Sequence, residues 1–357
     1  MYTRNLTQEE STTTAARARD NHRLTAAAAP LGRVGIAALA AVICVGAPVA
    51  ALASTQSGTL NAGPSSQVAN AKAMTGCAAN PSSCGFPDAS NTGVPKGKKL
   101  LTVPGQISSG PGWHYDSRGW VEVDGNGANL TGLYIPYNLD ITASNVTISD
   151  SKVVTGGANA FGISVRHTSN VTIEDSTIAG LNTGAGRMMT GVKDVYADST
   201  GLTVLRDNIS MAETGVQLEA GTVRDSYIHN TGFIAGDHVN GVTSNGGGSG
   251  LLTIDHNTIL VNRNQTDAVG LFEDFGIQQN RVITNNLLAG GSYALYGGQN
   301  PGGAPTANIT VTGNVFSTTY YATGGAFGPV TYFNSAGAGD NWSGNTWDGT
   351  GQIIASP

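Results

Sequence analysis

The sequence predicts an all-β fold, a right-handed parallel β-helix of about eight or more coils over residues 92–357, and three observations support this prediction. One six-residue pattern recurs along most of the chain. Between its copies, apolar and polar residues alternate with the spacing of strands, and no segment carries a sustained helical apolar stripe. The chain also has 50 Gly among 357 residues, which suits an architecture with many tight turns.

The repeated pattern has an apolar residue at each end, and Asp, Asn, Ser, Gly or His dominate the positions between. Its copies start roughly 20 to 30 residues apart, as in stacked repeat architectures. The eight copies are Ile148–Val153, Ile173–Ile178, Val204–Ile209, Val223–Ile228, Ile254–Ile259, Ile283–Leu288, Val311–Phe316 and Trp342–Trp347.

Each copy predicts a corner between two short parallel strands, with its apolar ends facing inward. Stacked Asn and Ser side chains should then hydrogen-bond from coil to coil as a ladder. His256 is interpreted as a ladder residue that replaces Asn. A β-propeller is the alternative, but each blade needs about 40 to 50 residues and four antiparallel strands.

The N-terminal residues 1–53 read as a secretory signal. Several Arg residues precede the apolar stretch Val34–Leu52, and Ala51–Ala53 gives a small-residue cleavage site. A membrane anchor is the alternative, because the stretch approaches the ~20 residues that span a bilayer. We expect a secreted, extracellular protein that has no membrane contact after signal cleavage.

Residues 54–91 are rich in Ser, Gly, Ala and Gln without a hydrophobic period, which predicts a flexible linker. Cys77 and Cys84 lie in it and would pair as a disulfide in an oxidising compartment. The formal net charge is -6, and the segment 1–53 has more basic than acidic residues. The remaining chain is therefore more acidic still, which argues against a nucleic-acid partner.

A second family of strands lies between the repeats, and its register predicts exposed columns. If Ile163, Val195, Val216 and Val242 point inward, the following residues form one outer column, consisting of Ser164, Tyr196, Gln217 and Thr243. A second column would contain Arg166, Asp198, Glu219 and Asn245. Asp198 and Glu219 would then be lateral neighbours, a pairing that suits acid/base chemistry or a Ca²⁺ ion.

The densest polar cluster is Ala235–Gly241, which contains Asp237, His238 and Asn240. Histidine suits proton transfer near neutral pH, and Asp237 could fix its tautomer. One coil further, Phe272 is followed by Glu273 and Asp274. Aromatic rings beside carboxylates suit a sugar-binding groove, because apolar sugar faces stack on rings.

The chain resembles the secreted β-helix proteins of the pectate-lyase-like superfamily, in the form common in actinobacteria. The resemblance rests on the repeats, on FPDASNTGVPKG (86–97) and on GDHVNGVTSNGG (236–247). It implies a carbohydrate-active protein with Asp237, His238 and Asn240 as its candidate site. Asn240 stands where the family segment has Asp, and the polygalacturonase signature is not present as such.

These observations favour a monomeric enzyme that cleaves a polysaccharide, by β-elimination at a uronate. His238 would be the base, and Asp237, Glu219 and Glu273 complete the catalytic set. Substrate-binding residues would be Asn240, Asn245, Tyr196, Gln217, Phe272, Asp274 and Arg166. A glycoside hydrolase with paired carboxylates is the first alternative, and a non-catalytic carbohydrate-binding or adhesion solenoid is the second. Ca²⁺ at Asp198 and Glu219 is the one cofactor considered.

Overall fold

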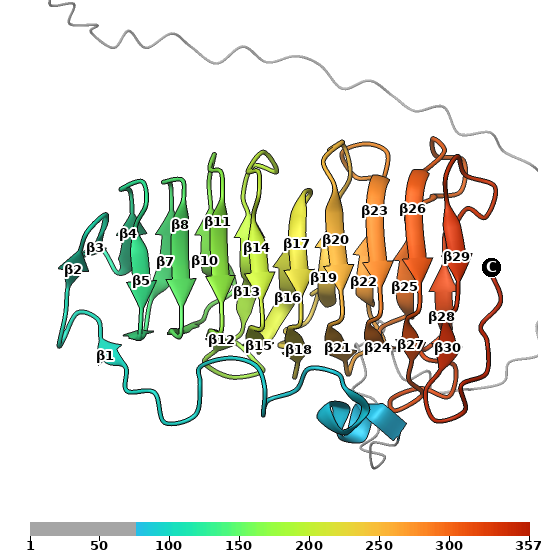
Figure 1. Ribbon diagram of the computed structural model, residues 1–357, viewed down its shortest axis with the longest axis horizontal. Coiled ribbons are helices and arrows are strands. Elements are labelled where there is room, and N and C mark those ends of the chain that lie inside the picture. The colour runs from blue at the N-terminus through green and yellow to red at the C-terminus, as the bar shows by residue number, and fades with distance from the viewer. Residues whose placement is uncertain (1–75) are drawn as a thin grey trace, which may run out of the picture. The chain divides into compact units, whose positions relative to one another are not determined.

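The computed structural model describes residues 76–357, so the predicted signal peptide and residues 54–75 of the predicted linker lie outside the described residues. The described chain is a parallel β-solenoid of about nine turns (Figure 1). Three sheets of short strands, named here sheets 1 to 3, run along it. Among the described residues, no helix has the length and apolar character needed to cross a membrane.

Sheet 1 contains ten strands, β1 (Leu101–Thr102), β6 (Leu133–Ile135), β9 (Lys152–Thr155), β12 (Thr177–Gly180), β15 (Asn208–Ser210), β18 (Tyr227–His229), β21 (Thr258–Val261), β24 (Leu287–Gly290), β27 (Val315–Phe316) and β30 (Thr346–Trp347). Sheet 2 contains eleven, β2 (Ser109–Gly110), β3 (Trp113–Asp116), β4 (Trp120–Val123), β7 (Asn138–Ile141), β10 (Phe161–Val165), β13 (Met188–Asp194), β16 (Ala212–Gln217), β19 (Asn240–Ser244), β22 (Asp267–Leu271), β25 (Tyr293–Gly297) and β28 (Gly328–Thr331). Sheet 3 contains nine, β5 (Asn129–Thr131), β8 (Val146–Ser149), β11 (Val171–Glu174), β14 (Thr203–Leu205), β17 (Gly221–Arg224), β20 (Leu252–Asp255), β23 (Gln279–Thr284), β26 (Ala307–Thr312) and β29 (Asn341–Ser343).

Each six-residue repeat forms the corner between a strand of sheet 3 and the next strand of sheet 1. Its third residue has a left-handed backbone, with φ of 50° at Asp150 and 57° at Asn285. Asp and Asn tolerate this conformation better than most residues. In the other six repeats this position also has a positive φ and is Asp, Arg, His or Gly, so the sharp corner recurs in every coil although the residue type varies.

The fourth residue of each repeat forms the predicted ladder. In every case its side-chain oxygen accepts a hydrogen bond from the backbone N–H one coil earlier, at 2.7–3.1 Å. The ladder residues, all fully buried, are Ser151, Ser176, Asp207, Ser226, Asn257, Asn286, Asn314 and Asn345. His256 is the left-handed corner residue beside Asn257 (φ 54°), so its assignment to the ladder was wrong by one position.

A column of small residues faces the interior where sheet 2 approaches sheet 1. Gly191, Gly215 and Gly241 follow one another in successive coils. A Cβ added at Gly241 would lie 2.2 Å from Ile259 Cγ2 of sheet 1. Glycine is required here because the two walls of the coil come within contact distance.

The register of sheet 2 corrects one predicted strand. Ile163 pairs with Val192, and Val192 with Val216, so Val192 and not Val195 is the inward residue of its coil. Lys193 consequently occupies the outer position predicted for Tyr196. The prediction failed because β13 begins and ends earlier than the segment chosen for it.

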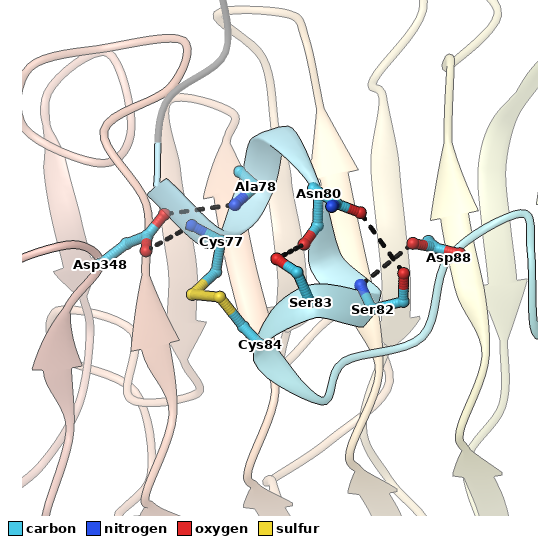
Figure 2. Close-up of a disulfide and its surroundings, with 8 residues drawn as sticks. All are labelled: Cys77, Ala78, Asn80, Ser82, Ser83, Cys84, Asp88 and Asp348. Atoms are coloured by element: carbon cyan, nitrogen blue, oxygen red, sulfur yellow. Dashed lines mark hydrogen bonds between the residues drawn. A yellow bond between two sulfur atoms is a disulfide. The ribbon is translucent and has the colours of Figure 1, made fainter.

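The N-terminal strap, residues 76–100, lies along the solenoid. It begins with two short 3₁₀ helices, η1 (Gly76–Ala79) and η2 (Pro81–Cys84). A disulfide joins Cys77 to Cys84, and the carboxylate of Asp348 in the last coil accepts the backbone N–H of Cys77 at 2.8 Å (Figure 2). Residues 76–91 are thus packed against the solenoid and do not form a flexible linker.

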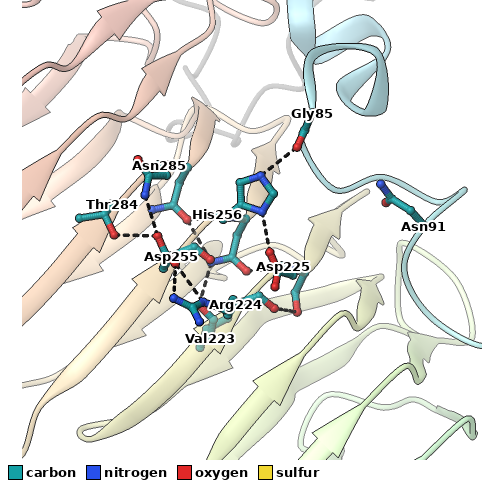
Figure 3. Close-up of polar contacts among 12 residues, drawn as sticks. Gly85, Asn91, Val223, Arg224, Asp225, Asp255, His256, Thr284 and Asn285 are labelled. Atoms are coloured by element: carbon teal, nitrogen blue, oxygen red, sulfur yellow. Dashed lines mark hydrogen bonds and ion pairs between the residues drawn. The ribbon is translucent and has the colours of Figure 1, made fainter.

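The middle of the strap is held by His256 (Figure 3). The Nδ1 atom lies 2.5 Å from Asp225 Oδ1, and Nε2 lies 2.8 Å from the carbonyl oxygen of Gly85. The strap then passes the fourth coil, where the Gly93 N–H donates to Arg206 O at 2.8 Å. It ends at β1, so the first strand of the solenoid is at Leu101 and residues 92–100 belong to the strap.

Candidate functional site

A groove of about 560 Å³ lies on the outer face of sheet 2, over β13, β16, β19 and β22. Residues early in these strands or just before them form one side, which we call the Glu213 wall. It consists of Met189, Thr190, Glu213, Thr214, His238, Asn240 and Thr266. Residues later in the strands or just after them form the Lys193 wall, which consists of Lys193, Gln217, Thr243, Asn245, Phe272 and Asp274.

The two walls arise from a local irregularity of the strands. Gly191 and Val192 both face the interior, because a Cβ on Gly191 would meet Ile209 of sheet 1 and Val192 is fully buried. Strict alternation would place one of them outside. Since two consecutive residues face inward, Thr190 before them and Lys193 after them both face the groove.

Lys193 provides the cationic group of the Lys193 wall. Its Nζ donates a hydrogen bond to Gln217 Oε1, a neutral partner on the adjacent strand. Burial lowers the pKa of Lys193, and the nearby carboxylates of Asp194 and Glu219 offset this only in part. A lysine in this setting is closer than usual to losing its proton near neutral pH.

Glu213 is the carboxyl group of the opposite wall, and a buried arginine positions it. Arg187 lies 2.7 Å from Glu213 and 2.5 Å from Asp237, so one guanidinium holds two carboxyl groups. Burial raises the pKa of Glu213, the neighbouring Asp237 raises it further, and Arg187 opposes both effects. Glu213 is therefore a carboxyl group inclined to keep its proton.

Asp237 does not hold His238 as predicted. Its two oxygens accept hydrogen bonds from Arg187, and one of them also accepts the backbone N–H of Ile234 at 2.7 Å. The exposed His238 ring has Gln265 Nε2 at 3.2 Å from Nδ1 instead. The role of Asp237 is to anchor the loop before β19 through Arg187.

Asn240 lies in the groove and supports the segment that carries His238. Its Nδ2 donates to the carbonyl oxygen of His238 at 2.8 Å and to Thr214 Oγ1 at 3.3 Å. Its Oδ1 is buried and has no hydrogen-bond partner within residues 76–357. The side chain is thus fixed by two donated bonds, with one acceptor unused.

Glu219 and Asp198, the predicted Ca²⁺ ligands, are not neighbours. Because Lys193 pairs with Gln217, Asp198 falls beyond the end of the paired strand, and its carboxylate contacts His167 Nδ1 at 2.6 Å. Glu219 is buried and accepts hydrogen bonds from Ser244 Oγ (2.6 Å) and from the backbone N–H groups of residues 245 and 246. Burial raises its pKa. Glu219 therefore stabilises a turn, and the predicted ion site and catalytic role lose their geometric basis.

Arg166 and Tyr196 form a separate exposed group with His167. The rings of Tyr196 and His167 stack at 4.2 Å, and Arg166 Nε donates to Asp140 at 2.7 Å. None of these residues lines the groove described above. The register correction explains this, because Lys193 takes the place predicted for Tyr196.

Phe272, Glu273 and Asp274, which were predicted to act together, line two different hollows. Phe272 and Asp274 line the Lys193 wall, as do Gln217 and Asn245. Glu273 instead turns toward a different hollow, where the Asn300 N–H approaches its Oε2 at 3.4 Å. Of the predicted catalytic residues, only His238 thus lies in the groove.

Lys193 and Glu213 are the titratable groove residues that were absent from every predicted set of site residues. A signal for both exists in the sequence, because Gly191-Val192 repeats the Gly-Val pair of residues 215–216 and 241–242. Aligning these pairs sets the register and places Lys193 beside Gln217. Glu213 then falls one residue before the outward position of Thr214.

A group of possible metal ligands exists elsewhere in the described chain. His114, Asp116 and Glu122 lie on the antiparallel pair β3–β4 at the N-terminal end. The Arg118 guanidinium already binds Asp116 through three hydrogen bonds of 2.6–3.0 Å and lowers its pKa to about 2. This carboxylate has its partner without an ion.

No family model matches this chain, and no curated protein matches it.

Proposed function

We propose that the protein is a secreted polysaccharide lyase of the pectate-lyase-like type, which cleaves an acidic polysaccharide by β-elimination at a uronate. The observation that carries the proposal is Lys193. It is a half-buried lysine in the groove wall, with a lowered pKa and the neutral amide of Gln217 as its hydrogen-bond acceptor. Such a group attracts a uronate while protonated and removes a proton once neutral.

The elimination requires a base for the C5 proton and a proton donor for the departing oxygen. The Lys193 amine takes the proton at C5 of the uronate, a double bond forms between C4 and C5, and the C4–O bond breaks. The Glu213 carboxyl group, whose pKa is raised, gives its proton to the departing oxygen. The residue types on the two walls match this division of labour.

His238 is assigned a donor role rather than the role of the base. In the hydrogen bond with Gln265, the amide Nε2 donates and Nδ1 accepts, so the proton of the neutral ring resides on Nε2. An Nε2–H group can donate to a substrate oxygen. The amides of Gln217 and Asn245 on the opposite wall supply further donors for the uronate carboxylate.

The test uses residues 54–357 and a panel of acidic and neutral polysaccharides, with the ultraviolet absorbance of unsaturated uronates as readout. Lys193→Arg keeps the charge but cannot lose its proton. We expect this variant to bind the polymer and to lose turnover by about 100-fold or more, the usual contribution of a general base. Lys152→Arg, on sheet 1 away from the groove, is the matched control. Full turnover in Lys193→Arg would remove Lys193 as the base.

A glycoside hydrolase is the second candidate, because Glu213 and Asp274 place carboxyl groups on opposite walls of the groove. Paired carboxyl groups across a sugar-binding groove are what hydrolysis requires. Release of reducing ends without unsaturated products would favour this alternative. Retained binding with neither product would indicate a carbohydrate-binding solenoid.

A further inference from the structure

Asp267 is a buried carboxyl group beneath the groove that the proposed reaction does not use. It begins β22, where it is the direct register partner of Asn240 on β19. The residue has no exposed surface, and neither of its side-chain oxygens has a hydrogen-bond partner in the part of the chain that the structure describes. A buried carboxyl group without partners is rare in folded proteins and needs an explanation.

The Asp267 side chain is fully buried among Gly270, Phe272 and Tyr296. A Cβ added at Gly270 would lie 2.6 Å from Asp267 Oδ2 and 2.6 Å from Phe272 Cε2, so both side chains pack closely over Gly270. Burial raises the pKa of Tyr296 on β25 to about 12, and the nearby Asp267 contributes to the rise. Burial alone raises the pKa of Asp267 well above its usual value.

Asn240 offers the matching acceptor. Its amide donors are both engaged, with His238 O and Thr214 Oγ1, whereas its Oδ1 is buried and unpaired among the described residues. Adjacent strands lie ~4.8 Å apart, so paired side chains on one face are within hydrogen-bond reach. An ionised Asp267 has no proton to donate, but a protonated Asp267 has one O–H.

We propose that Asp267 remains protonated at neutral pH and donates its O–H to Asn240 Oδ1, forming an acid–amide pair beneath the groove. Asp267 is thereby a positioning residue. It fixes Asn240, and Asn240 fixes the backbone of His238 on the Glu213 wall. The inference deepens the proposed function, since it concerns the same groove.

The pair also gives a physical reason for the amide at position 240. Asn240-Gly241-Val242 and Asp267-Ala268-Val269 occupy equivalent places in successive coils. Two carboxylates at these buried places would repel each other. An amide and a neutral acid can instead hydrogen-bond to each other. The chain thus has Asn at position 240, where the family segment has Asp, and its carboxyl group at position 267 in the next coil.

The first experiment measures thermal unfolding between pH 4 and pH 9, without substrate, in the wild type, Asp267→Asn and Asp267→Leu. The native pKa of Asp267 lies above its unfolded value, so its contribution to stability is complete below about pH 4 and is lost as pH rises through the native pKa. Asn has no such titration. We therefore expect the wild-type melting temperature to fall relative to Asp267→Asn as pH rises.

The second experiment separates the hydrogen bond from burial alone. Asn at position 267 keeps a donor for Asn240 Oδ1, whereas Leu does not. We expect the NMR signal of the His238 ring to stay in place in Asp267→Asn and to shift in Asp267→Leu. The exchange variant Asn240→Asp/Asp267→Asn restores one acid and one amide, and should melt higher than Asn240→Asp alone.

The outcomes decide the proposal without reference to turnover. A difference between wild type and Asp267→Asn that does not change with pH would show that Asp267 carries no retained proton. Identical His238 signals in the Asn and Leu variants, or an exchange variant no more stable than Asn240→Asp, would show that no pair exists. If the pair is found but no polysaccharide is cleaved, the proposed function fails and the pair stands.

Discussion

The ladder of buried side chains gives a quantitative prediction, which we develop for Asn286. Its Oδ1 accepts the backbone N–H of Asn257 at 2.9 Å, and its Nδ2 donates to the carbonyl oxygen of Ile254 at 2.9 Å. Asn286→Ala leaves the backbone N–H of Asn257 buried without its acceptor and removes one donor from the Ile254 carbonyl, which still belongs to the pairing of β20 with β23. An unpaired buried N–H costs about 1–3 kcal/mol and a lost hydrogen bond about 0.5–1.5 kcal/mol, so the total loss is about 1.5–4.5 kcal/mol.

A serine variant serves as the matched comparison. Ser226 in the same ladder accepts a backbone N–H through its Oγ at 3.1 Å. The hydroxyl introduced by Asn286→Ser would accept the backbone N–H of Asn257 in the same way. This variant therefore loses the hydrogen bond to the Ile254 carbonyl and should lower the free energy of unfolding by about 0.5–1.5 kcal/mol.

Urea unfolding followed by tryptophan fluorescence gives the midpoint and slope for each variant. We expect the order wild type, Ser, Ala, with distinct midpoints. A loss of about 1.5–4.5 kcal/mol is a large part of the roughly 5–15 kcal/mol that holds a typical domain folded. Equal midpoints for the wild type and Asn286→Ala would refute the reasoning, and so would a serine variant no better than alanine.

Three further predictions concern the glycine column between sheets 2 and 1, the strap and acid stability. Gly241→Ala should cost about 1–3 kcal/mol through overpacking against sheet 1, whereas Gly105→Ala, where an added Cβ meets nothing, should leave the urea midpoint unchanged. Replacing Cys77 and Cys84 by Ser should expose residues 76–91 to limited proteolysis; mass spectrometry locates the cuts, and first cuts inside the solenoid would contradict this. Burial lowers the pKa of His229 to about 4, so its contribution, about 3 kcal/mol, is complete above about pH 6.5 and is lost as pH falls toward 4. His229→Gln should flatten that acid loss in melting experiments, and an unchanged acid profile would contradict the assignment.

The repeats predicted the solenoid well because one residue type does one structural task in every coil. A ladder residue such as Asn286 is Asn, Ser or Asp, whose oxygen reaches the backbone N–H of the preceding coil, and the corner residue beside it must tolerate a positive φ. These demands are local and periodic, and therefore visible in a single sequence.

The groove was harder to predict because its walls depend on strand register. Placing Val195 inward put Tyr196 and Asp198 on the outer face, while the actual inward residue is Val192. An error of three residues in one strand changed which carboxylates were judged to be neighbours. The Gly-Val pairs carry the correct register, since the glycine is forced by contact with sheet 1.

Contacts between side chains that are far apart in the sequence could not be predicted from local sequence patterns. Nothing near Asp237 in sequence indicates that Arg187 binds it, because the two residues meet only after two coils have stacked. The same holds for Asp225 and Gly85, which come together at His256. Such contacts need the three-dimensional register first.

The strap changes how the molecule can come apart. A linear array of repeats frays from its ends, because an end coil has a neighbour on one side only. Here the first residues of the strap are tied to Asp348 in the last coil, and its final residues lead into β1 at the opposite end. The two ends of the array are thus linked through a single covalent segment, as in a closed loop. Peeling off the last coil must also release the strap, so fraying at one end is coupled mechanically to the other.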